Sequence, residues 1–195
     1  MTSFEYAAIF YGIVVGLALT NIMSSVHKLV EAGRRVRWHW MAPLAAVDYA
    51  ILTTINFWLW WVTRDQMRSH STFLFFLLPL TGLTFLYLSC AATLPDEVPE
   101  TGIDLRDYYF ANRYRIWGFS AGFYLFNQVQ VMMNVVPGGY SGTLLHANLV
   151  YFGINAFAAA ECISLIFVRA PWWHAFVLIS GLASLLLFFG PMPII

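Results

Sequence analysis

The sequence predicts an all-α integral membrane protein, a bundle of six transmembrane helices that forms one domain over residues 1–195. Its composition is the first observation, because 60% of the residues are hydrophobic and only 10% are charged. A soluble domain carries about 25% charged residues. The second observation is a series of six apolar segments, most of about 20 residues, which is the length that crosses a bilayer.

Short polar or glycine- and proline-containing stretches separate the six segments. The basic stretch EAGRRVRWHW follows the first segment, TRDQMRSHS the second, and the acidic loop LPDEVPETGID the third. The glycine-rich VPGGYSG ends the fourth, and Pro171 begins the sixth in a first helical turn, where its missing N–H costs nothing. The predicted spans are residues 6–28, 41–62, 72–94, 116–136, 147–168 and 172–189.

Lysine and arginine are distributed unevenly between the loops. Eight lie near the ends of segments that share one side of the membrane: Lys28, Arg34, Arg35, Arg37, Arg106, Arg113, Arg115 and Arg169. Only Arg64 and Arg68 lie on the other side. Because cytoplasmic loops carry the excess of Lys and Arg, we expect both termini on the non-cytoplasmic side.

Three stretches of the sequence resemble a known family. They are FEYAAIFYGIVVGLALTNI, the proline-containing FFLLPLTGLTFLYLSCAATLPDE, and DLRDYYFANRYR. Together they resemble a family of small multi-span bacterial inner-membrane proteins of uncharacterised function, over roughly the first 120 residues. The resemblance implies a bacterial inner membrane and no activity. Combined with the distribution of Lys and Arg, it leads us to expect both termini in the periplasm.

Two carboxylates fall inside predicted spans at a similar depth. Asp48 is seven residues past Met41, and Glu161 is eight residues before Arg169. At 1.5 Å per residue they lie about 10 and 12 Å inside the same membrane boundary, with Asn21 in or near this layer. An ionised Asp costs roughly 2.5–3.5 kcal/mol at the centre of a membrane helix. We therefore expect Asp48 to face the bundle interior.

The fourth segment carries a line of polar residues along its whole length. One helical stripe contains Arg113, Trp117, Ser120, Tyr124, Asn127, Val131 and Asn134, with Gln130 beside it and Gln128 off it. Lipid cannot satisfy these groups, so the stripe must face protein or water. The candidate transport or binding residues are therefore Asp48, Glu161, Asn21, Tyr124, Asn127, Gln130 and Asn134. The structural alternative is that the amides only bond neighbouring helices, worth about 0.6 kcal/mol each.

Two segments share a pattern of residues. YGIVVGLALTN (11–21) and WGFSAGFYLFN (117–127) both read aromatic-Gly-x3-Gly-x2-Leu-x-Asn. Because the first and fourth spans run in opposite directions, one interpretation is a weak inverted 3+3 repeat, as in secondary transporters. The other is close helix packing at Gly12/Gly16 and Gly118/Gly122.

Catalytic motifs are weak in this sequence. GFSAG (118–122) matches G-x-S-x-G at Ser120, with His174 as a conceivable partner, but a nucleophile elbow requires a strand-turn-helix. Haem ligation requires two histidines at one depth, and His146 is separated from the others. A Schiff base requires a buried lysine, whereas Lys28 lies at the boundary. We expect no enzyme, no cofactor, no bound metal and no nucleic-acid partner.

The acidic loop has its own alternatives. Its carboxylates could hold a divalent cation, but we expect it to be solvated and partly paired with the basic loop after the first span. Asp104 suits the N-cap of a helix that leads into the fourth span, with Asp107 in the first turn.

The polar layer favours a small transporter or channel that passes an ion, a proton or a small solute. The alternative is a non-transporting membrane partner, either an accessory subunit or a sensor, that docks through its charged cytoplasmic loops. A membrane enzyme that acts on lipid is a third hypothesis, which no motif supports. The expected partners are the bilayer and the transported species, and self-association is left open.

Overall fold

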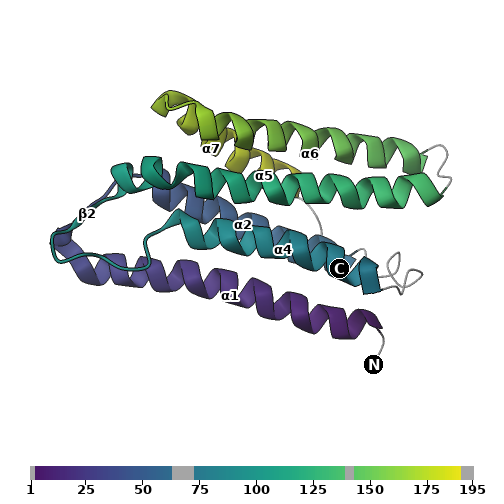
Figure 1. The fold of residues 1–195 in the computed structure, drawn as a ribbon, viewed down its shortest axis with the longest axis horizontal. Coiled ribbons are helices and arrows are strands. Elements are labelled where there is room, and N and C mark those ends of the chain that lie inside the picture. Colours follow the sequence, from purple (N-terminus) through teal and green to yellow (C-terminus); the bar gives the residue numbers. More distant parts are fainter. Residues whose placement is uncertain (1–2, 63–72, 139–142, 190–195) are drawn as a thin grey trace.

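The structure, a computed structural model, describes residues 3–62, 73–138 and 143–189 and contains six α-helices in these ranges. They are α1 (Ser3–Ala32), α2 (Met41–Val62), α4 (Phe73–Thr93), α5 (Leu105–Gly138), α6 (Thr143–Phe167) and α7 (Pro171–Phe189). The helices alternate in direction and form one elongated bundle (Figure 1). The expected helical bundle is confirmed, and α5 begins at Leu105, directly after the predicted cap at Asp104 and well before the predicted fourth span.

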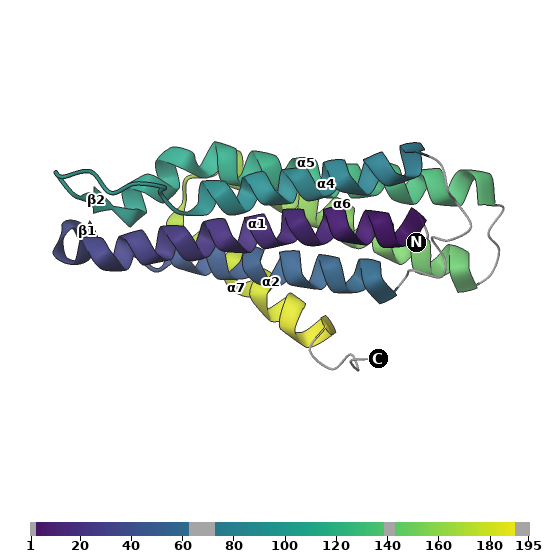
Figure 2. The ribbon, with the colours of Figure 1, turned by 90° about the horizontal axis from the view of Figure 1, so that it is seen from below.

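The least apolar of the six helices is α5. It packs against α4 and α6 along most of its length and also touches α2, while α1 covers α4 and α2. The last helix, α7, packs mainly on α2, and its C-terminal half diverges from the other helices in Figure 2. The most polar helix therefore packs mainly on three other helices, while α2 contacts four.

Three helical segments are long and apolar enough to cross a membrane: Ala7–Arg35, Met41–Leu59 and Asn148–Phe167. Two further apolar helical segments, Leu77–Thr93 and Pro171–Leu187, are shorter. Length and composition thus support part of the six-span prediction directly. The helix α5 is not among these segments, because its polar stripe lowers its mean hydropathy.

A small parallel pairing, which the sequence did not predict, fastens two loops at one end of the bundle. It joins β1 (Val36–Arg37), which follows α1, to β2 (Ile103–Asp104), which precedes α5. Gly102 has a φ of +86°, and a Cβ there would lie 2.6 Å from the carbonyl oxygen of Arg35. Only glycine allows this conformation and this approach, so Gly102 fixes the register of the pairing.

Charges at this end hold the same two loops together. Arg37 and Asp104 form an ion pair at 3.5 Å, and the Lys28 ammonium donates a hydrogen bond of 2.8 Å to the backbone carbonyl of Asp96. The expected partial pairing of the acidic loop with the basic loop is confirmed. One of the two contacts uses a backbone oxygen in place of a carboxylate.

The predicted glycine packing is right at one position and wrong at three. A Cβ on Gly122 would lie 2.9 Å from the Phe85 ring, so α5 and α4 are in close contact there. A Cβ on Gly12, Gly16 or Gly118 would meet nothing within 4 Å. The reason in α1 is that its buried face carries other side chains: Tyr11, Val15, Ala18 and Ile22. The inverted repeat itself stays a prediction.

The two aligned glycines give a matched test of this packing. We expect Gly122→Ala to lower the free energy of unfolding by about 1–3 kcal/mol, because the new methyl group overpacks against Phe85. Gly16→Ala has room, and it should be neutral or stabilising by about 0.5–1 kcal/mol because glycine is unfavourable inside a helix. Thermal unfolding in detergent measures both. Equal melting temperatures for the two variants would contradict the close contact.

The start of α5 is capped as the sequence predicts. The Oδ1 atom of Asp104 accepts hydrogen bonds from the backbone N–H of Arg106 at 2.9 Å and of Asp107 at 3.4 Å. The pKa of the Asp104 carboxyl is held below its usual value, chiefly by the hydrogen bond from Arg106. The hydrogen bond from Asp107 and the nearby Arg37 charge lower this pKa further. The ionised carboxylate is therefore the form that stabilises the fold.

The cap makes stability depend on pH in a defined direction. The contribution of Asp104 is complete above its usual pKa of about 3.9 and is lost as the pH falls through its lowered value. We expect Asp104→Asn, which still caps the helix, to keep most of the stability at pH 7 and to lose this acid dependence, whereas Asp104→Ala lowers the melting temperature at pH 7. Unfolding curves between pH 7 and 3 measure this, and an identical acid dependence in Asp104→Asn and the wild type would contradict it.

Candidate functional site

Polar side chains meet α5 at three levels along the bundle. Near the β1–β2 end, an aromatic cluster joins α5 to α7. In the middle, hydroxyl groups of α2, α4 and α5 meet beside the two carboxylates, and further along an amide cluster joins α5 to α6. The three levels differ in how completely their polar groups are hydrogen-bonded.

The aromatic cluster forms a directional chain of hydrogen bonds. The Trp117 Nε1–H donates to the Tyr109 hydroxyl at 3.2 Å, and this hydroxyl lies 2.9 Å from His174 Nδ1. His174 Nε2 lies 2.9 Å from the carbonyl oxygen of Val168. A carbonyl can only accept, so Nε2 carries the proton and Nδ1 accepts from Tyr109. With this tautomer of His174, each polar side-chain atom of Trp117, Tyr109 and His174 has a hydrogen-bond partner.

The same cluster closes the end of α6. Besides the bond from His174 to Val168, the Arg113 guanidinium donates from Nε to the carbonyl of Ile166 at 3.1 Å. The last carbonyl groups of a helix have no partner within it, and a cation is favourable there. His174 is fully buried. It therefore serves as the joint between α5, α6 and α7.

The middle level is a network of hydroxyl groups. Ser120 Oγ donates to the carbonyl of Ile116 at 2.7 Å, lies 3.2 Å from Ser89 Oγ and is hydrogen-bonded to the Tyr49 hydroxyl. Because Ser120 bonds Tyr49 and Ser89 while His174 bonds Tyr109 and Val168, the GFSAG serine and this histidine have separate partners. Their geometry is that of packing contacts between helices.

The two carboxylates both act electrostatically on Tyr124 of α5. Asp48 and Glu161 are both partly buried, and both lie within electrostatic range of Tyr124. Asp48 is also within range of the Tyr109 hydroxyl. Among the described residues, neither carboxylate forms an ion pair with Lys or Arg. The structure thus brings together three of the seven residues singled out from the sequence.

One oxygen of this group stands apart from the other polar atoms. Asp48 Oδ1 is buried, and within the described ranges it has no hydrogen-bond partner. Buried polar atoms are nearly always paired, so each exception requires a reason. Its neighbours on α2 and α5 are engaged with one another: Tyr49 with Ser120, and Tyr109 with Trp117 and His174. The carboxylate therefore keeps an open acceptor inside the bundle.

The amide cluster lies further from the β1–β2 end. Asn127 Nδ2 lies 3.5 Å from Asn155 Oδ1, and Asn155 in turn donates to the carbonyl of Tyr151 at 2.8 Å. Gln128 donates to the carbonyl of Phe152 at 2.7 Å. For Asn127, the interpretation of an amide that bonds a neighbouring helix therefore fits the geometry.

The remaining sequence candidates have less defined surroundings. Asn21 and Gln130 are partly buried, and the structure gives them no side-chain hydrogen bond to another described residue. The side chain of Asn134 lies outside the described part of the structure. The stripe on α5 does face protein, since Trp117, Ser120 and Val131 are buried.

Several polar residues at these three levels were not identified as candidates from the sequence. They are Tyr49, Ser89, Tyr109, Gln128 and Asn155, all of them buried. Gln128 was placed off the stripe, but α5 has neighbours on several sides, so more than one stripe is buried. A usable signal was present for Asn155, which lies six residues before Glu161 within an apolar segment.

A comparison with known proteins finds no matching family model, no matching curated protein and no matching solved structure. Within the described ranges, no three His, Cys, Asp or Glu side chains gather in a way that could hold a metal ion. The chemistry of the site is therefore that of carboxylate, phenol and hydroxyl groups in an apolar bundle.

The aromatic cluster can be tested through one hydroxyl group. We expect Tyr109→Phe to lower the free energy of unfolding by about 1–3 kcal/mol, because His174 and Trp117 both lose their buried partner. The control is Tyr114→Phe on the same helix, whose side chain is 59% exposed. It should change stability by no more than about 0.5 kcal/mol. Equal unfolding curves for the two variants in detergent would show that the chain of hydrogen bonds is not formed.

Proposed function

We propose that this protein is a small membrane transporter or channel with six spans, which passes a proton, a cation or a small solute through the polar layer at Asp48. The single observation that carries the proposal is the buried Asp48 Oδ1 with no hydrogen-bond partner among the described residues. The bacterial inner membrane, with both termini periplasmic, is part of the proposal.

The outer surface of the bundle supports a membrane setting. Large apolar side chains are exposed on α1, α5, α6 and α7, and soluble proteins rarely expose apolar patches beyond a few hundred Å². Examples more than half exposed are Ile13, Leu17, Leu125, Met132, Leu149, Ile154, Phe157, Ile179 and Leu187. A bundle with a polar central helix and an apolar exterior is suited to lipid as solvent.

The ends of the helices support the orientation. The loops after α1, α4 and α6 lie at the β1–β2 end, and they or the adjacent helix ends carry all eight of the Lys and Arg residues counted on the cytoplasmic side. Arg64 and Arg68 lie outside the described residues. An excess of positive charge marks the cytoplasmic side, so the β1–β2 end is the cytoplasmic end.

The chemistry of the layer favours a cationic species. An unpaired carboxylate in an apolar bundle is unfavourable, and a bound proton or cation removes that penalty. Glu161 and Asp48 both act electrostatically on Tyr124, so oxygen-bearing side chains other than Asp48 belong to the same region. Ionisable residues inside a membrane commonly mark a proton relay or an ion pathway.

The alternative is the non-transporting membrane partner, and one observation favours it. The aromatic and amide clusters are hydrogen-bonded between helices, as in a bundle whose polar groups only hold it together. In that case the charged loops at the β1–β2 end would be the working surface. Asp48 distinguishes the two proposals, because only transport requires its open acceptor.

The test is flux into proteoliposomes. We expect Asp48→Asn to abolish pH-dependent uptake while leaving the melting temperature close to that of the wild type, because the amide is nearly isosteric but neither ionises nor releases a proton. The matched control is Asp107→Asn, an exposed aspartate in the first turn of α5, which should leave flux unchanged. Wild-type flux of H⁺, Na⁺ and K⁺ no greater than that of protein-free liposomes would reject transport and support the membrane partner. Equal flux above that level in the wild type and Asp48→Asn would reject the role of Asp48.

A further inference from the structure

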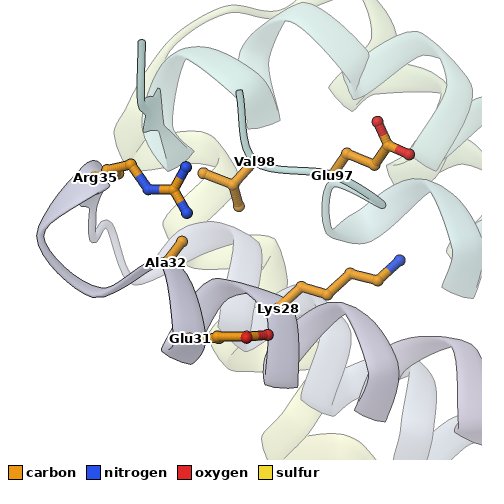
Figure 3. A pocket seen from close by; sticks show the side chains of 6 residues that line it. All are labelled: Lys28, Glu31, Ala32, Arg35, Glu97 and Val98. Atoms are coloured by element: carbon orange, nitrogen blue, oxygen red, sulfur yellow. The ribbon is translucent and has the colours of Figure 1, made fainter. Parts of the chain in front are cut away.

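A pocket lies at the β1–β2 end, between the last turns of α1 and the segment that follows α4. Its volume is about 370 Å³, within the range of small-ligand sites. The lining residues are Lys28, Glu31, Ala32, Arg35, Glu97 and Val98. Figure 3 shows the Arg35 guanidinium and the Lys28 ammonium on opposite sides, with Val98 between them and Glu97 near Lys28. The pocket therefore has two positive and two negative side chains around a small apolar floor.

These charges do not neutralise one another. Among the described residues, no ion pair joins Lys28 or Arg35 to Glu31 or Glu97. The Lys28 ammonium gives one hydrogen bond to the backbone at Asp96, which leaves two N–H donors. Glu31 lies 3.9 Å from His27, but both side chains are more than 70% exposed, so this contact is weak. A ligand that carries both signs of charge would complement the pocket.

Along the face of α1 that leads away from the pocket, the type of exposed side chain changes in a regular order. Steps of three and four residues keep positions on one helical face. From the pocket, this face carries charged side chains first, then exposed hydroxyl groups, then exposed apolar side chains: Glu31, Lys28, Ser24, Thr20, Leu17, Ile13 and Phe10. Arg35 follows in the short turn after α1. Leu17 is 55% and Ile13 53% exposed. A phospholipid has the same order, with a charged headgroup, ester oxygens and acyl chains.

We infer that this pocket binds the zwitterionic headgroup of an ethanolamine phospholipid, whose acyl chains lie along α1. The phosphate is held by Arg35, whose guanidinium matches its geometry, and by the free donors of Lys28. The ammonium donates hydrogen bonds to Glu97 and Glu31. This inference rests on the membrane placement in the proposed function, and it is independent of transport at Asp48.

The pocket favours ethanolamine over other headgroups. Choline has no N–H donor and is recognised by aromatic side chains, whereas the six lining residues contain no aromatic ring. A glycerol headgroup offers its phosphate to Arg35 but no cation to Glu31 and Glu97, so two carboxylates stay uncompensated. The two glutamates therefore set the specificity, and the two cations set the affinity.

The experiment is native mass spectrometry of the full chain purified in detergent. Equimolar ethanolamine, choline and glycerol phospholipids with identical acyl chains are added, and the retained lipid is identified. We expect the wild type to retain the ethanolamine lipid several-fold more than either of the others. Arg35→Gln should reduce retention of all three lipids. The double variant Glu31→Gln with Glu97→Gln should reduce ethanolamine retention to the level of choline.

Exposed neighbours that do not line the pocket provide matched controls. Arg34→Gln and Glu100→Gln should each leave the ethanolamine preference unchanged. Equal retention of the three lipids by the wild type, or a preference that survives in the double glutamate variant, would overturn the inference. Free glycerophosphoethanolamine serves as a competitor. Weak competition supports a bound lipid. Competition as strong as that of the lipid itself would show that the pocket binds a soluble zwitterion and would overturn the lipid as its ligand.

This result can be separated from the outcome for transport. In the same preparation, Asp48→Asn should retain the ethanolamine preference even though its flux is lost. A chain found in the membrane fraction without lipid preference overturns only the headgroup site. A chain that fractionates with soluble proteins overturns the membrane placement and the headgroup site with it.

Discussion

The requirement that governs this molecule is that polar groups must find their partners within the protein when its surroundings are apolar. It explains why the least apolar helix, α5, turns its polar side chains toward α2, α4, α6 and α7. It also explains why the helices, α5 included, can present apolar side chains outward on their other faces. Each level of hydrogen bonding along α5 fixes one neighbour: His174 fixes α7, Ser120 bonds Tyr49 of α2, and Asn127 and Gln128 bond α6.

The length of the apolar segments and the Gly, Pro and polar stretches between them predicted the helices well. Both features depend only on residues that are neighbours in the sequence. The cap at Asp104 was predicted for the same reason. The β1–β2 pairing was not, because it joins residues far apart in sequence through two-residue strands and depends on a positive φ at Gly102. The contacts of Asn155 and His174 depend on which helices become neighbours, and spacing within one helix carries no information about that.

The polar interior contains two physically different kinds of group. Most of the amides, phenols and hydroxyl groups are bonded to a neighbouring helix or to backbone carbonyls, and exchanging those partners would require the helices to separate. Asp48 Oδ1, Gln128 Oε1 and the charges around the pocket at the end of α1 have hydrogen-bonding or pairing capacity that the described residues do not use. Asp48 was identified from its unfavourable position in the sequence. The pocket was not, because its charges come from the end of α1 and from a loop some 60 residues later.

The joint at His174 has a consequence for how the protein is made. The helix α7 leaves the ribosome after α5 and α6, so the Tyr109 hydroxyl and the open carbonyl at Val168 exist before their imidazole partner does. During that interval the end of α6 lacks one of its two caps, and the Tyr109 hydroxyl accepts from Trp117 but lacks the acceptor for its own hydrogen. When His174 is in place, both hydrogen bonds form. Assembly of the bundle is thereby coupled to insertion of α7. A chain that stops before α7 leaves the Tyr109 hydroxyl and the Val168 carbonyl without this partner, and cellular quality control can detect such unpaired polar groups.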